Sequence, residues 1–212
     1  MSIAIQPTAK EPKRERGKQR VAALIDAGAE LFAEKGYEAT TMTEIATRAC
    51  AAIGSLYQFF PSKEALAEAL FNRFAERARA SFARVAALAP GRSAGGLADL
   101  FIDHKLGLGA DRDAALALSE EVGAIVERRK PLGEALRGEI AAVLMAANRA
   151  LGEEEAAAAA IIVNQIMKMV PALAAATDGR AWALVGEARK LLSLYLEEVL
   201  GRRRRPSRRQ SS

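Results

Sequence analysis

The fold is decided by residues 20–73, which read RVAALIDAGAELFAEKGYEATTMTEIATRACAAIGSLYQFFPSKEALAEALFNR. This stretch predicts a helix that ends at Gly36, two very short helices separated by a few small residues, and a longer helix that opens at Ser62. Two short helices this close together bury little surface on their own. Braced by longer helices, they fit a helix-turn-helix, a motif whose second helix is presented to a DNA groove.

Capping and breaking residues set the boundaries of these helices. Apolar residues from Val21 to Phe32 repeat at the spacing of one helical face, in a helix expected to begin at Gln19. Thr41-Met42-Thr43-Glu44 matches a capping box that opens the first short helix. Pro61 ends the second, expected over residues 52–59. Spacings of three and four residues favour the core, rather than a contact surface, for three apolar side chains of this region: Ile53, Leu56 and Phe60.

The remaining chain also reads as helical. Alanine and leucine dominate, aromatic residues make up 5% of the 212 residues, and strand-forming runs are scarce. Glycine, proline and aspartate punctuate the sequence after residue 85. They delimit five further expected helices, at residues 94–108, 112–128, 132–151, 153–176 and 180–200. The predicted fold class is therefore all-α.

Charge is concentrated at the two ends. Residues 10–20 contribute +4 and residues 202–209 contribute +6 to a net charge of +5, which leaves −5 on residues 21–201. Basic arms of this kind engage phosphates without sequence preference, although solvated, disordered ends that aid solubility are an equal reading of the C-terminal one. We expect a soluble, cytoplasmic protein, because no signal peptide and no apolar run of membrane-spanning length is evident and a lone cysteine, Cys50, suits a reducing compartment.

Hydrogen-bond donors gather around the two short helices. They are the side chains of Thr41, Thr43, Ser55, Tyr57, Gln58 and Lys63. Donors at helix starts are suited to phosphate oxygens, and the two-ended amide of Gln58 is suited to a base edge. Gly54 would let a DNA backbone come close. Tyr57 has a second reading, as a half-buried core residue with its hydroxyl exposed.

This segment closely resembles the DNA-binding domain of TetR-family transcriptional regulators. The resemblance covers about a quarter of the chain and lies in Gly36-Tyr37, Thr40-Thr41, Ile45-Ala46, Gly54-Ser55-Leu56-Tyr57 and Ser62-Lys63-Glu64. It implies a homodimer that binds a roughly palindromic operator and releases it when a small molecule enters the C-terminal domain. The DNA contacts that it implies are Thr41, Thr43, Ala52, Gly54, Ser55, Tyr57, Gln58, Phe59 and Lys63.

The turn between the short helices departs from the family pattern. Cys50 stands where a glycine with positive φ is usual, which should cost about 1 kcal/mol if the backbone is unchanged. Ala52 lacks the hydroxyl that would cap the recognition helix, a loss of roughly 1 kcal/mol. Gln58-Phe59 replaces the usual aromatic-histidine pair. These departures bear on the operator sequence and the affinity, not on the fold.

The C-terminal helices mix polar with apolar residues, as a small-molecule pocket requires. The candidate pocket residues are Phe101, His104, Glu120, Met145, Asn148, Asn164 and Lys168. Alternatively, His104 and Asn148 are satisfied interhelical hydrogen bonders and Met145 is core filler. The last two helices carry more apolar surface than one core needs, and we expect the homodimer to form through them.

The prediction is a ligand-responsive repressor without cofactor, metal site or membrane segment. Its alternative is a constitutive helix-turn-helix repressor without a small-molecule ligand. An enzyme is improbable, because one histidine and one cysteine leave no catalytic or metal-ligand set. The expected division is a disordered basic arm (1–18), the helix-turn-helix domain (19–62), a helical ligand-binding and dimerisation domain (63–201) and a disordered Arg-rich tail (202–212).

Overall fold

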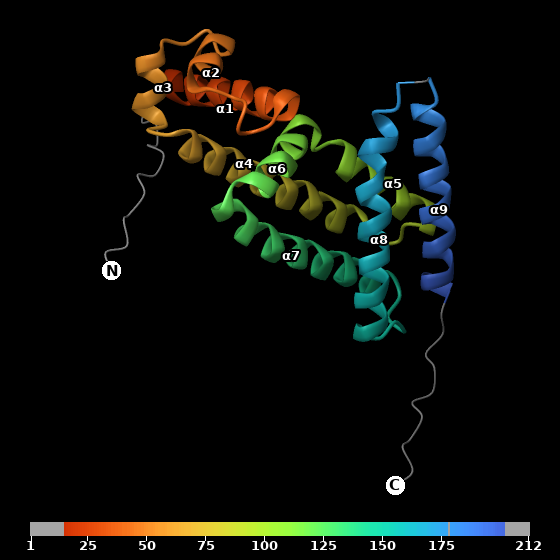
Figure 1. Ribbon diagram of the computed structural model, residues 1–212. Coiled ribbons are helices and arrows are strands. Elements are labelled where there is room, and N and C mark those ends of the chain that lie inside the picture. The colour runs from red at the N-terminus through yellow and green to blue at the C-terminus, as the bar shows by residue number, and fades with distance from the viewer. Residues whose placement is uncertain (1–14, 178, 202–212) are drawn as a thin grey trace. The chain divides into compact units, whose positions relative to one another are not determined.

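The computed structural model describes residues 15–177 and 179–201, without the side chains of several residues between 110 and 129. This described part of the chain is all-α and contains no strand, as predicted (Figure 1). The helices are α1 (Glu15–Lys35), α2 (Met42–Arg48), α3 (Ile53–Phe59), α4 (Lys63–Leu88), α5 (Ala94–Leu106), α6 (Gly109–Glu121), α7 (Gly123–Ala147), α8 (Glu153–Ala174) and α9 (Ala181–Gly201).

Packing groups these helices into two units. Unit 1 comprises the chain up to Arg77 together with residues 108–132, and unit 2 comprises residues 78–107 with the chain from Gly133 onward. α4 and α7 each contribute one part to unit 1 and the other to unit 2. Packing therefore divides the chain differently from the functional boundary expected at residue 63, which stays a prediction.

In unit 1, α1 packs against both α2 and α6, and α2 packs against α3. α4 lies very close to α1, because a Cβ added at Gly28 would come within 2.6 Å of Leu66 Cδ2. Polar groups join the same helices. The side chain of Asp111, in the first turn of α6, is almost fully buried and accepts hydrogen bonds from Arg73 and Arg77 of α4. Arg73 also reaches Asp26 on α1.

In unit 2, α5 packs against α8 and α9, which also pack against each other. The core of this unit is formed by apolar side chains such as Phe82, Phe101, Leu144, Val163 and Leu192. At the edge of this core, Arg189 of α9 pairs with Asp99 and Asp103 of α5.

Two sequence-based boundaries were wrong. α1 begins at Glu15 rather than Gln19, so residues 15–18 of the expected disordered arm are helical; an acidic side chain in the first turn suits the positive end of the helix dipole. The break expected at Pro131 falls at Val122 instead, and α7 continues through the proline. Pro131 and Glu127 are both exposed, so water can hydrate the carbonyl that loses its partner. Residues 1–14 and 202–212, which hold most of the two basic arms, lie outside the described residues.

α8 bears on the expectation that no apolar run reaches membrane-spanning length. It is the one helix in the described ranges that is long and apolar enough to cross a membrane by length and composition, although no single apolar run in it is long. Seven of its residues are buried, and they belong to the core of unit 2. This burial matches a core helix, and its exposed face carries both polar residues such as Lys168 and apolar residues such as Ile161 and Met169.

Candidate DNA-binding surface

The loop that leads into α2 is held by buried polar contacts in unit 1. Gly36 ends α1 with φ of 84°, the left-handed conformation that glycine adopts without strain. Thr40 is buried, and its hydroxyl lies 2.8 Å from the carbonyl oxygen of Gly36. The ring of Tyr37 packs on Phe32, and its hydroxyl donates to a carboxylate oxygen of Glu64 over 2.9 Å. These contacts set the direction in which the chain enters the helix-turn-helix.

Lys63, expected to contact phosphate, is engaged within the protein. Its ammonium donates to the backbone carbonyls of Tyr37 (2.8 Å), Thr40 (3.1 Å) and Glu38 (3.3 Å), and it lies 4.2 Å from the centroid of the Tyr37 ring. An ammonium has three hydrogens, so three carbonyls use all its donors. In this conformation Lys63 ties the start of α4 to the loop before α2.

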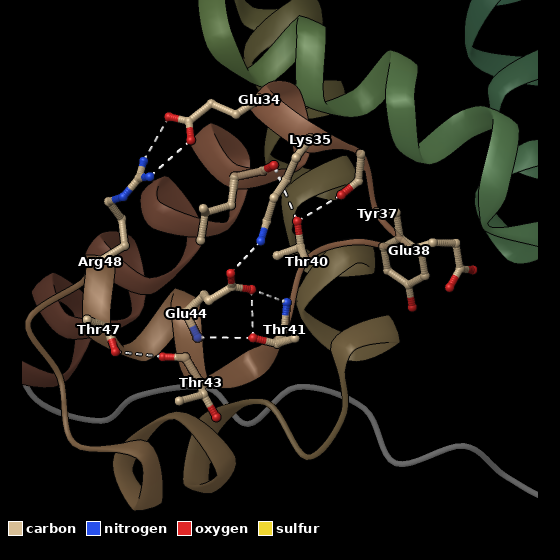
Figure 2. A network of polar contacts seen from close by, with 12 residues as sticks. Glu34, Lys35, Tyr37, Glu38, Thr40, Thr41, Thr43, Glu44, Thr47 and Arg48 are labelled. Atoms are coloured by element: carbon tan, nitrogen blue, oxygen red, sulfur yellow. Dashed lines mark hydrogen bonds and ion pairs between the residues drawn. The ribbon is translucent and has the colours of Figure 1, made fainter.

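α2 opens with the predicted capping box (Figure 2). The Thr41 hydroxyl accepts from the backbone N–H of Glu44 and donates to its carboxylate, which also accepts the Thr41 backbone N–H. A hydrogen bond from Lys35, together with those from Thr41, lowers the pKa of Glu44 to about 2. The capping box leaves the side chains of Thr41 and Thr43 exposed at the beginning of α2.

The only basic residue of α2, Arg48, faces acidic residues of α1. Its guanidinium donates to both carboxylate oxygens of Glu34 and to one of Glu30. These bonds raise the pKa of Arg48 and lower that of Glu34. Because both cations of this region, Lys35 and Arg48, are already paired with carboxylates, they hold α2 against α1 and are not free to grip phosphate without breaking those pairs.

The turn between α2 and α3 carries the two irregularities expected from the sequence. Cys50 has φ of 50° and is the only non-glycine residue with positive φ in the described ranges. Ala52 occupies the N-cap of α3, where no side chain bonds to the first turn. Backbone bonds compensate in part, since Cys50 N–H donates to Thr47 and Ala51 N–H donates to Ala46.

α3 presents one face to the core and the other to solvent. Leu56 is fully buried and Phe60, just past the helix, is 1% exposed, as predicted. Tyr57 is 51% exposed, and Ala52, Gly54 and Gln58 are also on the surface. A Cβ at Gly54 would meet no protein atom within 4 Å, so packing gives no reason for this glycine. The open face of α3 is therefore accessible to a large partner.

One expectation for α3 needs correction, and the DNA contacts expected of Ser55 and Phe59 stay predictions. Ile53, assigned to the core, is 42% exposed. At about 100° per residue it lies about 40° from Tyr57 and 60° from Leu56, so helical geometry places it nearer the exposed residue, a signal that the three-residue spacing obscured. Ser55, expected to contact DNA, is half-buried, and its Oγ is enclosed with no hydrogen-bond partner among the described residues. Phe59 is also half-buried.

Two of the candidate pocket residues meet in unit 2. Phe101 is fully buried, His104 is 6% exposed, and the Phe82 ring contacts both. Nδ1 of His104 shares a hydrogen bond of 2.9 Å with Ser81 Oγ. Burial lowers the pKa of His104 to about 4, helped by the nearby charges of Lys105 and Arg84. His104 is therefore a neutral, satisfied core histidine in this conformation.

The other candidate pocket residues differ in their burial and contacts. Asn148 accepts from the backbone N–H of Ala150 and donates to the carbonyl of Val199, an interhelical role. Met145 packs at the edge of the core. Asn164 is half-buried and Lys168 is exposed on α8. The side chain of Glu120 lies outside the described residues, and a pocket formed by these candidates stays a prediction.

The comparisons agree with the geometry of α1–α4. The family model of bacterial regulatory proteins of the tetR family matches residues 24–70. The chain is 42% identical over 81 residues to the HTH-type transcriptional repressor KstR of Mycolicibacterium smegmatis, covering 38% of this chain and 37% of that protein. It is 40% identical over 60 residues to the A-factor receptor protein of Streptomyces griseus, covering 28% and 22%. The chain thus matches well under two thirds of the length of these curated relatives.

The likeness to solved structures extends further along the chain. A transcriptional regulator from Aquifex aeolicus VF5 superimposes with a TM-score of 0.66 at 18% identity, over 82% of this chain and 98% of that chain. At this identity the likeness shows a shared fold. The sequence match concerns the helix-turn-helix segment: residues 24–70, which include α2, α3 and parts of α1 and α4, match the tetR family of bacterial regulatory proteins.

Proposed function

We propose that this protein is a cytoplasmic transcriptional regulator, a repressor that binds a palindromic operator as a homodimer. Residues 19–62 would bind DNA, and residues 63–201 would form the dimer and bind a small lipophilic effector that releases the operator. The observation that carries the DNA-binding role is the exposed face of α3, where Ala52, Gly54, Tyr57 and Gln58 lie together on a braced two-helix unit.

Selection from random duplex DNA with the full-length protein, followed by footprinting, tests DNA binding. We expect an enriched palindrome, and Tyr57→Ala should weaken binding to it by about 10-fold or more, the usual effect of losing one good contact. Leu88→Ala is the matched control, because Leu88 is also 51% exposed but lies at the end of α4. Failure to enrich any sequence, or equal weakening by both variants, would refute the proposal.

Lys63 requires a test that separates two roles. A direct phosphate contact predicts that Lys63→Ala lowers the slope of log affinity against log salt by about 1. The contacts seen here predict faster hydrogen exchange in residues 37–41, since three carbonyls lose their donor. A reduced salt slope with unchanged hydrogen exchange supports the phosphate contact. An unchanged salt slope with faster hydrogen exchange in residues 37–41 indicates that Lys63 instead holds the loop before α2.

The proposed homodimer rests on the α8–α9 surface, defined as the exposed apolar residues of those two helices. Trp182 is 84% exposed and Leu194 is 65% exposed. Large apolar side chains exposed to this extent are costly for a monomer to leave in water and often mark a protein–protein interface. The full surface comprises Ile161, Ile162, Met169, Trp182, Leu191 and Leu194.

Sedimentation equilibrium tests this surface. The wild-type protein should be a dimer at micromolar concentration, and Leu194→Glu should shift it to monomer, because the new carboxylate would be desolvated at the interface. Leu88→Glu places the same charge on another exposed leucine of unit 2, outside α8 and α9, and should leave the dimer intact. A wild-type monomer would contradict the proposal, as would a Leu194→Glu dimer of unchanged affinity.

Effector binding has support and a competing alternative. One relative is named as a receptor, which supports a ligand-binding role by analogy. The packing of Phe101 and His104 into the core instead favours a constitutive repressor without a ligand. A thermal-shift screen of lipophilic compounds separates the two. A compound that raises the melting temperature and also releases the operator supports the effector-binding repressor. If no compound of a broad panel raises the melting temperature, the constitutive repressor is supported.

A further inference from the structure

The recognition helix of this chain has an unusual chemical character. Residues 49–62, which include the turn, α3 and the residues after it, contain no charged side chain. The exposed face of α3 offers an isoleucine at its first position and a tyrosine one turn later, Ile53 at 42% and Tyr57 at 51% exposure. Beside them lie Ala52 and Gly54, which contribute no hydrogen-bonding side chain.

Direct readout by this face is therefore restricted. A guanine in the major groove is recognised mainly by a bidentate arginine or lysine, and α3 supplies neither. The nearest cations, Arg48, Lys35 and Lys63, are held by carboxylates or carbonyls of the protein. Ser55 Oγ is enclosed, which removes another polar contact.

The remaining chemistry favours one base pair. The thymine C5-methyl is the apolar group of the major groove, and an exposed aliphatic side chain is its natural partner. We propose that Ile53 is a specificity-determining residue that packs against a thymine methyl in each operator half-site, so that α3 selects A·T pairs where it enters the groove. This assignment rests on the proposed DNA-binding function and adds a residue and a base preference to it.

Packing of the buried core does not account for an isoleucine at this position, because its side chain is 42% exposed. Its side chain is not part of the buried core, a polar residue would be more soluble there, and a β-branched residue has only modest helix propensity. An apolar side chain at the first position of an otherwise uncharged face is thus explained by an apolar contact with the partner. The same exposure means that substitution of Ile53 should leave folding intact.

The experiment uses the palindrome selected by the full-length protein and replaces each thymine of a half-site, one at a time, by deoxyuridine. This change removes only the methyl group. At one thymine, and its symmetry mate, we expect affinity to fall about 4-fold per half-site, the loss for one buried carbon group, and about 15-fold when both are replaced. Ile53→Ala should weaken binding to the thymine operator and bring the thymine-to-deoxyuridine ratio at that position close to 1.

Leu88→Ala serves as the control and should keep the wild-type ratio at every position. An Ile53→Ala protein that still distinguishes thymine from deoxyuridine as the wild type does would overturn the assignment, as would a wild-type protein indifferent to every methyl. A protein that enriches no duplex sequence overturns the proposed function itself. The two failures are therefore distinguishable.

Discussion

Replacing Cys50 by glycine should stabilise the helix-turn-helix. Cys50 has φ of 50°, a conformation that costs a residue with a Cβ roughly 1–2 kcal/mol. Glycine removes that cost but returns about 0.5–1 kcal/mol of backbone entropy to the unfolded chain. The Cys50 side chain is exposed, so its loss forfeits little packing. The expected net gain is about 0.5–1 kcal/mol in the free energy of unfolding.

Urea unfolding, with hydrogen exchange of residues 46–53 as a local probe, measures this gain. Cys50→Ala is the matched control, since it removes the thiol but keeps the Cβ and the strained φ. It should match the wild type within about 0.5 kcal/mol, the usual range for a surface change. The free energy of unfolding of Cys50→Asn should lie between those of Cys50→Gly and Cys50→Ala, because asparagine tolerates the left-handed region. If Cys50→Gly proves no more stable than Cys50→Ala, backbone strain is not stored at this turn and the reasoning is wrong.

Three other changes follow from the same structure. Ala52→Ser should add a hydroxyl N-cap to α3 and raise the free energy of unfolding by about 1 kcal/mol, measured by urea unfolding; no gain would mean that the cap geometry is unsuitable. Asp111→Asn should lower the free energy of unfolding by roughly 3 kcal/mol, because Arg73 and Arg77 lose a buried carboxylate partner. The control Asp26→Asn changes an exposed carboxylate and should cost under about 1 kcal/mol. Equal losses in the two variants would contradict a stabilising role for the buried Asp111 pairs. His104 binds its proton with a pKa of about 4 when folded, against an ordinary value of 6.5, so the unfolded state takes up the proton first as the pH falls. Compared with His104→Gln, the wild type should keep its full free energy of unfolding above pH 6.5 and lose about 3 kcal/mol of it between pH 6.5 and 4. If the free energies of unfolding of the two proteins change in parallel with pH, His104 is not the cause of the loss.

Local signals predicted unit 1 better than the rest of the chain. The sequence predicts three local features of this unit, because each depends on residues within a few positions of itself. They are the capping box at Thr41, the positive φ at Cys50 and the missing N-cap side chain at Ala52. Ile53 was misplaced because spacing alone does not say where a buried stripe ends. Exposure at the first residue of a short helix depends on what packs above it.

Prediction was weaker where contacts between distant residues decide the outcome. Lys130-Pro131 predicts a helix end, yet α7 passes through the proline, because water can hydrate the carbonyl that loses its hydrogen bond. The phosphate contact of Lys63 stays a prediction, but no local pattern indicates the contacts of its ammonium within the protein, because the loop that receives its three hydrogen bonds lies more than twenty positions earlier in the sequence. The sequence leaves two readings of His104, a pocket residue and a satisfied hydrogen bonder, and no local pattern could choose between them, because its partner Ser81 lies 23 positions earlier.

The uncharged recognition helix has a consequence for how discrimination depends on ionic conditions. The clustered bases at residues 10–20 and 202–209 would bind any duplex and release counterions, so that overall affinity falls steeply with salt. The contacts that α3 can make release none, because its residues carry no charge. The ratio of operator to random-sequence affinity should therefore stay nearly constant as salt rises, even while both affinities collapse. In this protein the strength of attachment and the choice of sequence would be independently adjustable, each by a different part of the chain.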